Sequence, residues 1–440
     1  MNWDQLLSAQ RPGQKTKAVE HSRSAFEQDH DRIIFSHPFR RLQDKTQVHP
    51  LPEHDFVHTR LTHSLEVSTV GRSLGKKAGE IILQRHPGLK NLHSIFDFGA
   101  VVAAGSLAHD LGNPPFGHAG EDAISDFFVH HPFGRGFQNS VSEEQWCELI
   151  KFEGNAQGFR ILNKDEYGLK LTHAALGAFM KYPCPAATPK DASRKSQKKY
   201  GFFEAEKQYF ALIADDLGLI SQGDHVWCRH PLAFLVEASD DICYSIIDLE
   251  DGCRLGLVRF DETVELLATI LGDKLNREKL DRTGGLNEKL GVLRAMTISE
   301  LIDATTEVFA DHEADMLDGK FDRALTDLCR YASSLKDITR VSIEKIYRAR
   351  HVVEIEAAGH EVLPGLLEEF TRAGIFLIRQ QQSRKYQNLA MLLPDEVRRD
   401  ILSDKEDVYG MLRSVIDFVS GMTDRHALSI YRKIKGMSLG

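Results

Sequence analysis

The chain has 440 residues, of which 42% are hydrophobic and 27% are charged. This composition excludes an extended, coreless chain and is typical of a globular protein of two to three domains. The formal net charge of −9 excludes a global positive field that would attract nucleic acid or a membrane surface. An anionic substrate would therefore need local neutralisation by a metal ion, lysine or arginine.

Three segments with apolar residues at helical spacing predict the central helices of the fold. They cover residues 57–83, 96–109 and 232–250. Gly112 is expected to cap the second helix, and Gly252 is expected to end the third. The segments are long enough to bury a core between them.

Most of the remaining chain also reads as helix, so we predict a mainly all-α fold. Only short pieces near Val48 alternate with the period of two that indicates a strand. Breaks are expected at residues 183–199, which are Pro-rich and then basic, and at residues 281–290, which are polar and contain a Gly pair. Beyond the second break, apolar residues within 325–335 recur at helical spacing and predict a further helix.

The N-terminal sequence and the cysteines indicate a cytoplasmic protein. Residues 1–15 contain no apolar stretch typical of a signal peptide, and no apolar run reaches 18 residues. The six cysteines form no C-x-x-C pair, which favours reduced thiols over a disulfide framework. We therefore expect no membrane partner.

Four potential metal ligands lie on or at the ends of the three central helices: His63, the adjacent pair His109 and Asp110, and Asp240. Two imidazoles and two carboxylates suit a divalent ion and leave positions open for water and a phosphate oxygen. Each alone is more simply a hydrogen-bonded histidine or a solvated aspartate. Together, in apolar surroundings where ionisable groups are costly unless paired or liganded, they predict a metal site.

Asp241 is the rival of Asp240 for the fourth ligand. We prefer Asp240 because Tyr244 and Asp248 follow it at i+4 and i+8, so the three lie near one helical face. Catalysis with four protein ligands requires a five- or six-coordinate ion. This favours one Mn, Fe, Ni, Co or Mg ion over zinc.

His118 and Glu121 form the best acid–base pair in the chain. They stand at i and i+3, just after the turn enforced by Pro114 and Pro115. A carboxylate beside an imidazole fixes its tautomer and stabilises its protonated form. The simpler alternative is that His118 only caps a helical turn.

Several polar residues could contact an anionic or nucleoside ligand. Arg60 stands one helical turn before His63, where its planar fork could reach a phosphate. Glu153, Asn155 and Gln157 could hydrogen-bond a base or sugar, or only cap a helix. For Arg41 and Lys45 a solvated face is at least as plausible as ligand contact. The basic run 194–199 could grip a polyphosphate or single-stranded nucleic acid, although a solvated loop is the simpler interpretation.

Six motifs carry a resemblance that extends from about Asp31 to Ala427. They are DRIIFSHPFRRLQDKTQV (31–48), HTRLTHSLEV (58–67), HDLGNPPFGHAGE (109–121), FEGNAQGFRIL (152–162), EASDDICYSIIDLED (237–251) and GMTDRHAL (421–428). Together they resemble the dGTP triphosphohydrolase family of the HD superfamily of metal-dependent phosphohydrolases. The resemblance implies hydrolysis of a deoxynucleoside triphosphate to a deoxynucleoside and triphosphate, by metal-assisted attack of water on the α-phosphorus.

The resemblance also implies roles for residues. It implies one metal ion at His63, His109, Asp110 and Asp240, with His118 and Glu121 as the catalytic pair. Gln47 and Arg60 match residues near the sugar and the α-phosphate, and Tyr244 and Asp248 match residues that recognise the deoxyribose. Arg425 falls in a motif that the family often places near an active site, in some cases a neighbour's. Members typically form homo-oligomers, often hexamers.

We accordingly divide the chain into three parts: an N-terminal segment (1–57) with a substrate-contacting loop, an HD metal-binding catalytic core (58–255), and a C-terminal helical region (256–440) that packs on the core. Alternative functions are another HD nucleotide phosphohydrolase, such as a 5′-nucleotidase or a phosphodiesterase, and a deoxynucleotide sensor without turnover. A third alternative is a metal site with a purely structural role. Intact His118 and Glu121 argue against the sensor.

Overall fold

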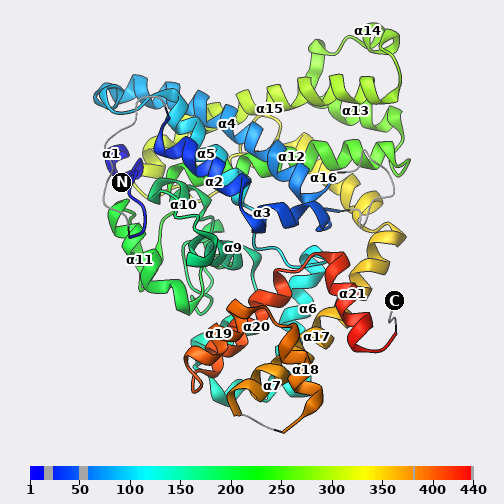
Figure 1. Ribbon diagram of the computed structural model, residues 1–440. Helices are drawn as coiled ribbons and strands as arrows, with labels where there is room; N and C mark the ends of the chain where they lie inside the picture. Colours follow the sequence, from blue (N-terminus) through cyan, green and yellow to red (C-terminus); the bar gives the residue numbers. More distant parts are fainter. Residues whose placement is uncertain (14–22, 49–57, 380–381, 438–440) are drawn as a thin grey trace.

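The computed structural model of the chain is almost entirely helical (Figure 1). It describes residues 1–13, 23–48, 58–379 and 382–437, and it contains 71% helix and 1% strand. The predicted all-α class is therefore confirmed. Within the described ranges the strands are β1 (Ser221–Gly223) and β2 (Val226–Trp227), an antiparallel pair with Ser221 opposite Trp227. The strand suggested near Val48 is absent at Val48 itself, which lies in a bend, and residues 49–57 beside it lie outside the described residues.

The three predicted central helices are present as α4 (Arg60–Arg85), α5 (Ile95–Ala108) and α12 (Pro231–Arg254). The predicted start of the first helix at Val57 lies outside the described residues. Glycines allow α4 and α5 to approach closely, because a Cβ at Gly75 would lie 2.6 Å from the carbonyl oxygen of Phe98.

Two glycines expected to end helices have a different role. Gly252 lies inside α12, where a Cβ would come within 2.4 Å of Ile346 Cδ1. Gly112 is not in the left-handed conformation of a C-cap, and His109 is the C-cap of α5. A Cβ at Gly112 would lie 2.0 Å from the carbonyl oxygen of Gly154, so this glycine serves a close contact between backbones.

The predicted breaks were partly right. Within residues 183–199 the chain forms only one short 3-10 turn, η5 (Lys195–Gln197). The second break is reduced to residues 283–285, between α14 (Arg277–Arg282) and α15 (Leu286–Leu317). The helix expected over 325–335 begins only with α16 (Ala332–Ser342), after a series of turns.

Other helices surround these elements. Those that precede α12 are α1 (Trp3–Leu6), α2 (Ala25–Ile34), α3 (His37–Arg41), α6 (Gly117–Val129), α7 (Pro132–Arg135), α8 (Glu143–Leu149), α9 (Gly154–Asn163), α10 (His173–Phe179) and α11 (Lys207–Asp216). Those that follow it are α13 (Phe260–Leu271), the π-helix η8 (Ile343–Tyr347), α17 (Arg350–Arg379), α18 (Arg384–Leu392), α19 (Asp395–Ser403), α20 (Val408–Ser420) and α21 (Asp424–Ile434). Short 3-10 turns are η1 (Leu42–Asp44), η2 (Pro87–Asn91), η3 (Gln138–Ser140), η4 (Asp165–Tyr167), η6 (Glu204–Glu206) and η7 (Gly272–Lys274).

The described residues pack around two hydrophobic clusters. The first is formed mainly by α1–α5 and α10–α16, and it contains the three central helices. The second is formed mainly by α6, α8 and α17–α21, which lie together in the lower part of Figure 1. Helix α9 contributes Phe159 to the first cluster and Ala156 to the second. The junction between the clusters is where the candidate site lies.

Candidate metal centre and active site

Helices α4, α5 and α12 bring the four expected ligands together. His63 Nε2 lies 3.2 Å from Asp240 Oδ1, and His109 Nε2 lies 3.5 Å from the same oxygen. His109 Nε2 also lies 3.4 Å from Asp110 Oδ1. His63, His109 and Asp110 form a group whose ligand atoms all lie within 4.8 Å of one another; Asp240 is not part of this group, although its Oδ1 faces both histidines. Ring nitrogens and carboxylate oxygens thus face one another at distances that suit one small cation.

Neighbouring groups orient these side chains for a metal ion. His109 Nδ1 lies 2.7 Å from the carbonyl oxygen of Ser106, so Nδ1 carries the proton and Nε2 offers its lone pair to the cluster. Arg60 Nη1 donates to Asp110 Oδ2 at 2.6 Å. Burial alone would raise the pKa of Asp110, but Arg60 and the two histidines hold it well below its usual range. The donor set therefore fits a divalent cation.

Asp240 and Asp241 point to different partners. Asp240 faces the two histidines, whereas Asp241 Oδ2 accepts a hydrogen bond from Thr326 Oγ1 at 2.6 Å. Burial raises the pKa of Asp240, but His109 and His63 outweigh it and lower that pKa to about 2. Burial raises the pKa of Asp241 to about 6. The preference for Asp240 as ligand stays a prediction, and these contacts support it.

The cluster opens into a cavity of about 670 Å³ that also receives the expected acid–base pair. His118, on α6, has an 81% exposed side chain and places Nδ1 2.9 Å from Glu121 Oε2. This hydrogen bond raises the pKa of His118 above its ordinary value. Predicted residues that line the cavity are Gln47, Arg60, His63, His109, Asp110, His118, Glu121, Asn155, Asp240, Asp241 and Tyr244.

Glu121 is held by more than His118. Its Oε1 accepts the backbone N–H of Gly154 at 2.7 Å, and Lys199 Nζ lies 3.7 Å from its Oε2. Lys199 also contacts Glu153, whose side chain caps the start of α9 and accepts from Asn155 Nδ2 at 2.7 Å. Burial would raise the pKa of Glu121, but His118, Lys199 and the Gly154 N–H together lower it. Glu153, from the motif at 152–162, thus caps a helix, and Lys199, from the basic run 194–199, supports the Glu121 carboxylate.

Asp248 does not line the cavity with Tyr244. Its carboxylate is 4% exposed and accepts a hydrogen bond from the Tyr347 hydroxyl at 2.7 Å. Tyr347 lines the cavity and stacks on Tyr244, with ring centroids 5.5 Å apart and an interplanar angle of 24°. Sequence reasoning missed Tyr347 because it ends the π-helix η8, whose period differs from that of an α-helix.

Most of the basic residues considered as ligand contacts already have hydrogen-bond or ion-pair partners within the protein. Lys45 is neither solvated nor directed at the cavity: it is 4% exposed and donates to two backbone carbonyls. In the run 194–199, Arg194 pairs with Asp322, Lys195 with Glu237 and Asp327, and Lys199 with Glu121 and Glu153. Lys198 lines the cavity. Arg425 is exposed and does not belong to the cavity lining.

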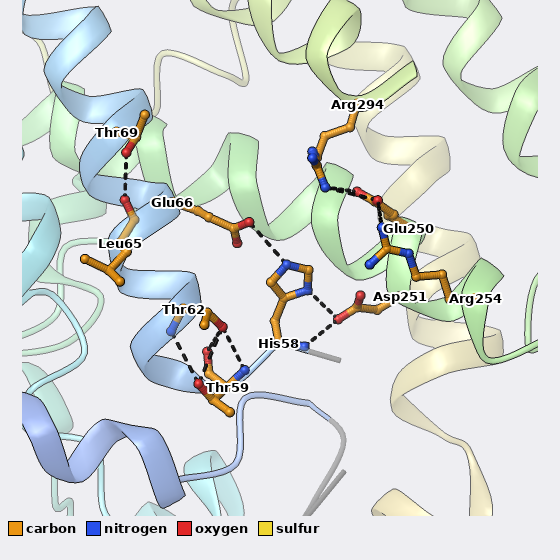
Figure 2. A network of polar contacts seen from close by, with 10 residues as sticks. All are labelled: His58, Thr59, Thr62, Leu65, Glu66, Thr69, Glu250, Asp251, Arg254 and Arg294. Atoms are coloured by element: carbon orange, nitrogen blue, oxygen red, sulfur yellow. Dashed lines mark hydrogen bonds and ion pairs between the residues drawn. The ribbon is translucent and has the colours of Figure 1, made fainter. Parts of the chain in front are cut away.

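A polar network joins the start of α4 to α12 (Figure 2). His58 stands just before the N-cap of α4, and its Nδ1 lies 2.8 Å from Asp251 Oδ2 on α12. Its backbone N–H donates to the same oxygen at 3.1 Å, and its Nε2 lies 3.2 Å from Glu66 Oε1. Burial lowers the pKa of His58, but the two carboxylates outweigh it and raise that pKa to about 10. The protonated imidazole thus ties together the two helices that carry His63 and Asp240.

Comparison with known families agrees with this arrangement. A model of the HD domain matches residues 60–151, and a model of a phosphohydrolase-associated domain matches residues 328–433. The fold and the cluster of histidines and aspartates thus define a helical HD-domain phosphohydrolase. Among the described residues, no helix is long and apolar enough to cross a bilayer.

Relatives that match over the full length of the chain indicate one family within this class. The chain is 42% identical to a deoxyguanosinetriphosphate triphosphohydrolase-like protein of Synechocystis sp., with both chains fully covered. It is 38% identical to a protein of the same description from Pseudomonas aeruginosa, over 100% of this chain and 99% of the relative. It is 30% identical to a deoxyguanosinetriphosphate triphosphohydrolase of Yersinia pestis, over 99% of each chain. The chain belongs to the dGTP triphosphohydrolase-like family of HD phosphohydrolases.

Proposed function

We propose that the protein hydrolyses deoxynucleoside triphosphates to a deoxynucleoside and inorganic triphosphate. The observation that carries this proposal is the convergence, on one cavity, of the His–Asp cluster and the His118–Glu121 pair. The relatives named as dGTP triphosphohydrolases support the substrate class. The described lining supplies no serine or cysteine nucleophile, which fits direct attack by water.

His63, His109, Asp110 and Asp240 would hold the divalent ion. When bound, the ion supplies Lewis acidity and offsets the negative charge that builds up on the α-phosphoryl group. Arg60, paired with Asp110 at the edge of the cluster, is placed to share its guanidinium with a phosphate oxygen. Gln47 and Asn155 line the same cavity, where they would hydrogen-bond the nucleoside.

His118 would act as the general acid. Water attacks the α-phosphorus, the bond from phosphorus to the 5′ oxygen breaks, and the leaving oxygen takes its proton from His118. Glu121 keeps the imidazole protonated and oriented, because its carboxylate accepts from Nδ1 and leaves Nε2 to face the substrate. The broad exposure of His118 to the cavity gives a substrate access to that proton.

The stacked pair Tyr244 and Tyr347 would form the sugar wall. Asp248 fixes the hydroxyl of Tyr347, and burial raises the pKa of Asp248 to about 7. Two stacked aromatic rings, one of them tethered, would leave little room for a 2′ hydroxyl on a sugar bound against them. This wall would favour a deoxyribose over a ribose.

The test is identification of the products. The protein is incubated with Mn²⁺ and each deoxynucleoside triphosphate, singly and in mixtures, and the phosphate products are separated by ion chromatography. Release of inorganic triphosphate supports the proposal. Release of orthophosphate or a monophosphate would instead indicate another nucleotide phosphohydrolase, and tight nucleotide binding without any turnover would indicate a sensor.

Homo-oligomer formation and binding of single-stranded nucleic acid stay predictions. The internal carboxylate partners of Arg194, Lys195 and Lys199 reduce the positive charge that this run could offer to a nucleic acid. A deoxynucleoside triphosphate is therefore the partner that we propose for this site.

A further inference from the structure

A buried clasp joins the C-terminal helices to two segments of the cavity wall. We use the word clasp for Lys45, Thr46, Asn113, Phe116, Ser420 and Asp424. Asp424 is the first residue of α21 and is 3% exposed. Thr46, Asn113 and Phe116 line the cavity, whereas Lys45 and Asp424 lie behind this lining. The clasp thus reaches the site without facing the substrate.

Asp424 binds both wall segments with one carboxylate. Its Oδ2 accepts the backbone N–H of Thr46 at 3.0 Å and also the Thr46 hydroxyl. Its Oδ1 accepts the backbone N–H of Phe116 at 3.1 Å. Thr46 directly precedes Gln47, and Phe116 is the N-cap of the helix that carries His118. One side chain therefore sets the relative position of two segments that are 70 residues apart in sequence.

Lys45 closes the clasp from the other side. Its Nζ donates to the carbonyl oxygen of Asn113 at 2.5 Å and to that of Ser420, the last residue of α20, at 2.9 Å. Both of its partners are backbone atoms, so the bonds fix chain positions and not only side chains. Arg41 adds a bond from its Nη1 to the carbonyl oxygen of Gly421 at 3.2 Å.

The geometry of α6 explains why such a clasp is needed. Phe116 has φ +65°, a left-handed conformation that residues with a side chain rarely adopt. This conformation turns the chain from the segment after Asp110 into α6, and so it sets the direction in which His118 projects. An N–H held by a buried carboxylate stabilises that conformation, because the charged acceptor forms a strong hydrogen bond.

We propose that Asp424 is a positioning residue, which acts on turnover through His118 and Gln47 and does not contact the substrate. This inference rests on the proposed function. The C-terminal region would then contribute to catalysis, because α20 and α21 fix the positions of the two cavity segments around Thr46 and Phe116 relative to the metal cluster. A misplacement of about 1 Å at the general acid is enough to cost on the order of 10²-fold in rate.

The experiment compares Asp424→Asn with a matched control, Asp29→Asn. Asp29 is also fully buried, and its Oδ2 accepts both the backbone N–H and the hydroxyl of one threonine, Thr172; its Oδ1 in addition pairs with Arg11 Nη1 at 2.5 Å, so its replacement should cost at least as much stability. It lies outside the cavity lining. Both substitutions remove a charge and a hydrogen-bond acceptor, so both lower the melting temperature. Only Asp424→Asn should lower kcat per folded molecule, by about 10- to 100-fold.

A double-mutant cycle with His118→Ala separates positioning from a general loss of stability. If Asp424 acts through His118, Asp424→Asn should lower kcat little further once His118 is absent. Full additivity of the two losses, or wild-type kcat in Asp424→Asn, would overturn the proposal. If Asp424→Asn does not fold, Thr46→Val removes only the hydroxyl donor, and it should lower kcat severalfold; unchanged kcat would count against the clasp.

Hydrogen exchange keeps the test independent of the proposed function. Asp424→Asn should speed amide exchange in residues 113–118 of the metal-loaded protein, whereas Asp29→Asn should leave that segment unchanged. If the wild type releases no triphosphate but the segment loosens, the proposed function fails and the clasp stands. If exchange in 113–118 is unchanged, the clasp fails whatever the activity.

Discussion

At the scale of single residues, the site depends on which partner each ionisable group finds. His118 keeps a raised pKa because Glu121 accepts its Nδ1 proton, and Glu121 keeps its charge because Lys199 and the Gly154 N–H stabilise it. Sequence motifs identified His118 and Glu121, because their spacing places them one helical turn apart. They placed Lys199 in a basic run but did not predict its contact with Glu121, since that contact depends on how a loop far along the chain is folded back.

Replacement of His118 by alanine should reduce kcat by roughly 10²–10⁴ and leave metal content intact. The reason is that His118 supplies the proton but contributes no ligand to the cluster. Steady-state kinetics and elemental analysis of the purified variant measure both effects. His130→Ala is the control, since His130 is exposed, lies outside the cavity lining and has its Nε2 3.6 Å from Asp126 Oδ1. Wild-type turnover in His118→Ala would show that His118 is not the general acid.

The pH profile tests the partnership with Glu121. Because the pKa of His118 is raised, the acid form persists above the ordinary pKa of 6.5, and kcat should fall only as pH rises through the higher value. Glu121→Gln removes the carboxylate that raises this pKa, so the alkaline fall should move to lower pH. An alkaline limb that does not move in Glu121→Gln would mean that another group is titrating.

The choice between Asp240 and Asp241 is also decided at this scale. Asp240→Ala should lose bound metal, because its oxygen faces His63 and His109. Asp241→Ala should retain metal, because that carboxylate is bound to Thr326. Elemental analysis of both variants after dialysis measures this directly, and the reverse pattern would exchange the two assignments.

At the scale of elements, close helix packing and the His58 network hold the ligand-bearing helices in place. The periodicity of apolar residues predicted α4, α5 and α12, since each has a long apolar face. It could not predict that Gly252 would lie inside α12, because the need for glycine there comes from Ile346 on a distant segment. Likewise Tyr347, the last residue of the π-helix η8, lines the site although no helical spacing in the sequence indicated it.

Glycine at the α4–α5 contact gives a direct test of packing. Gly75→Ala would place a Cβ 2.6 Å from the Phe98 carbonyl oxygen, so the helices must separate. We expect a loss of about 1–3 kcal/mol in the free energy of unfolding. Gly88→Ala is the control, since a Cβ there meets nothing within 4 Å. Denaturant unfolding measures both, and equal stability of the two variants would contradict the close contact.

The His58 network predicts a pH dependence of stability. The pKa of the His58 imidazole is raised to about 10 in the folded protein. Its protonated form therefore contributes fully to the free energy of unfolding below the unfolded pKa of about 6.5. That contribution is lost as pH rises towards 10. His58→Gln should therefore cost about 1–3 kcal/mol near pH 6, and the difference from wild type should shrink with rising pH. Unfolding curves at several pH values measure it; a difference that grows with pH would contradict the assigned charge.

At the scale of the whole molecule, the site lies at the junction of two hydrophobic clusters. The helices that carry the histidines and aspartates pack in the first, whereas α6 with His118 packs in the second together with the C-terminal helices. The fold class was predictable from the sequence, because most of the chain shows helical periodicity. The buried position of Lys45 was not predictable from the sequence, because it results from the packing of α20, more than 360 residues away along the chain.

The most direct test of the central claim is hydrolysis of a deoxynucleoside triphosphate in water labelled with ¹⁸O. The arrangement of the cluster and His118 predicts attack on the α-phosphorus, with the 5′ oxygen leaving on the nucleoside. Mass spectrometry should then find one ¹⁸O atom in the released triphosphate and none in the deoxynucleoside. Label in the deoxynucleoside, or release of orthophosphate in place of triphosphate, would contradict the account.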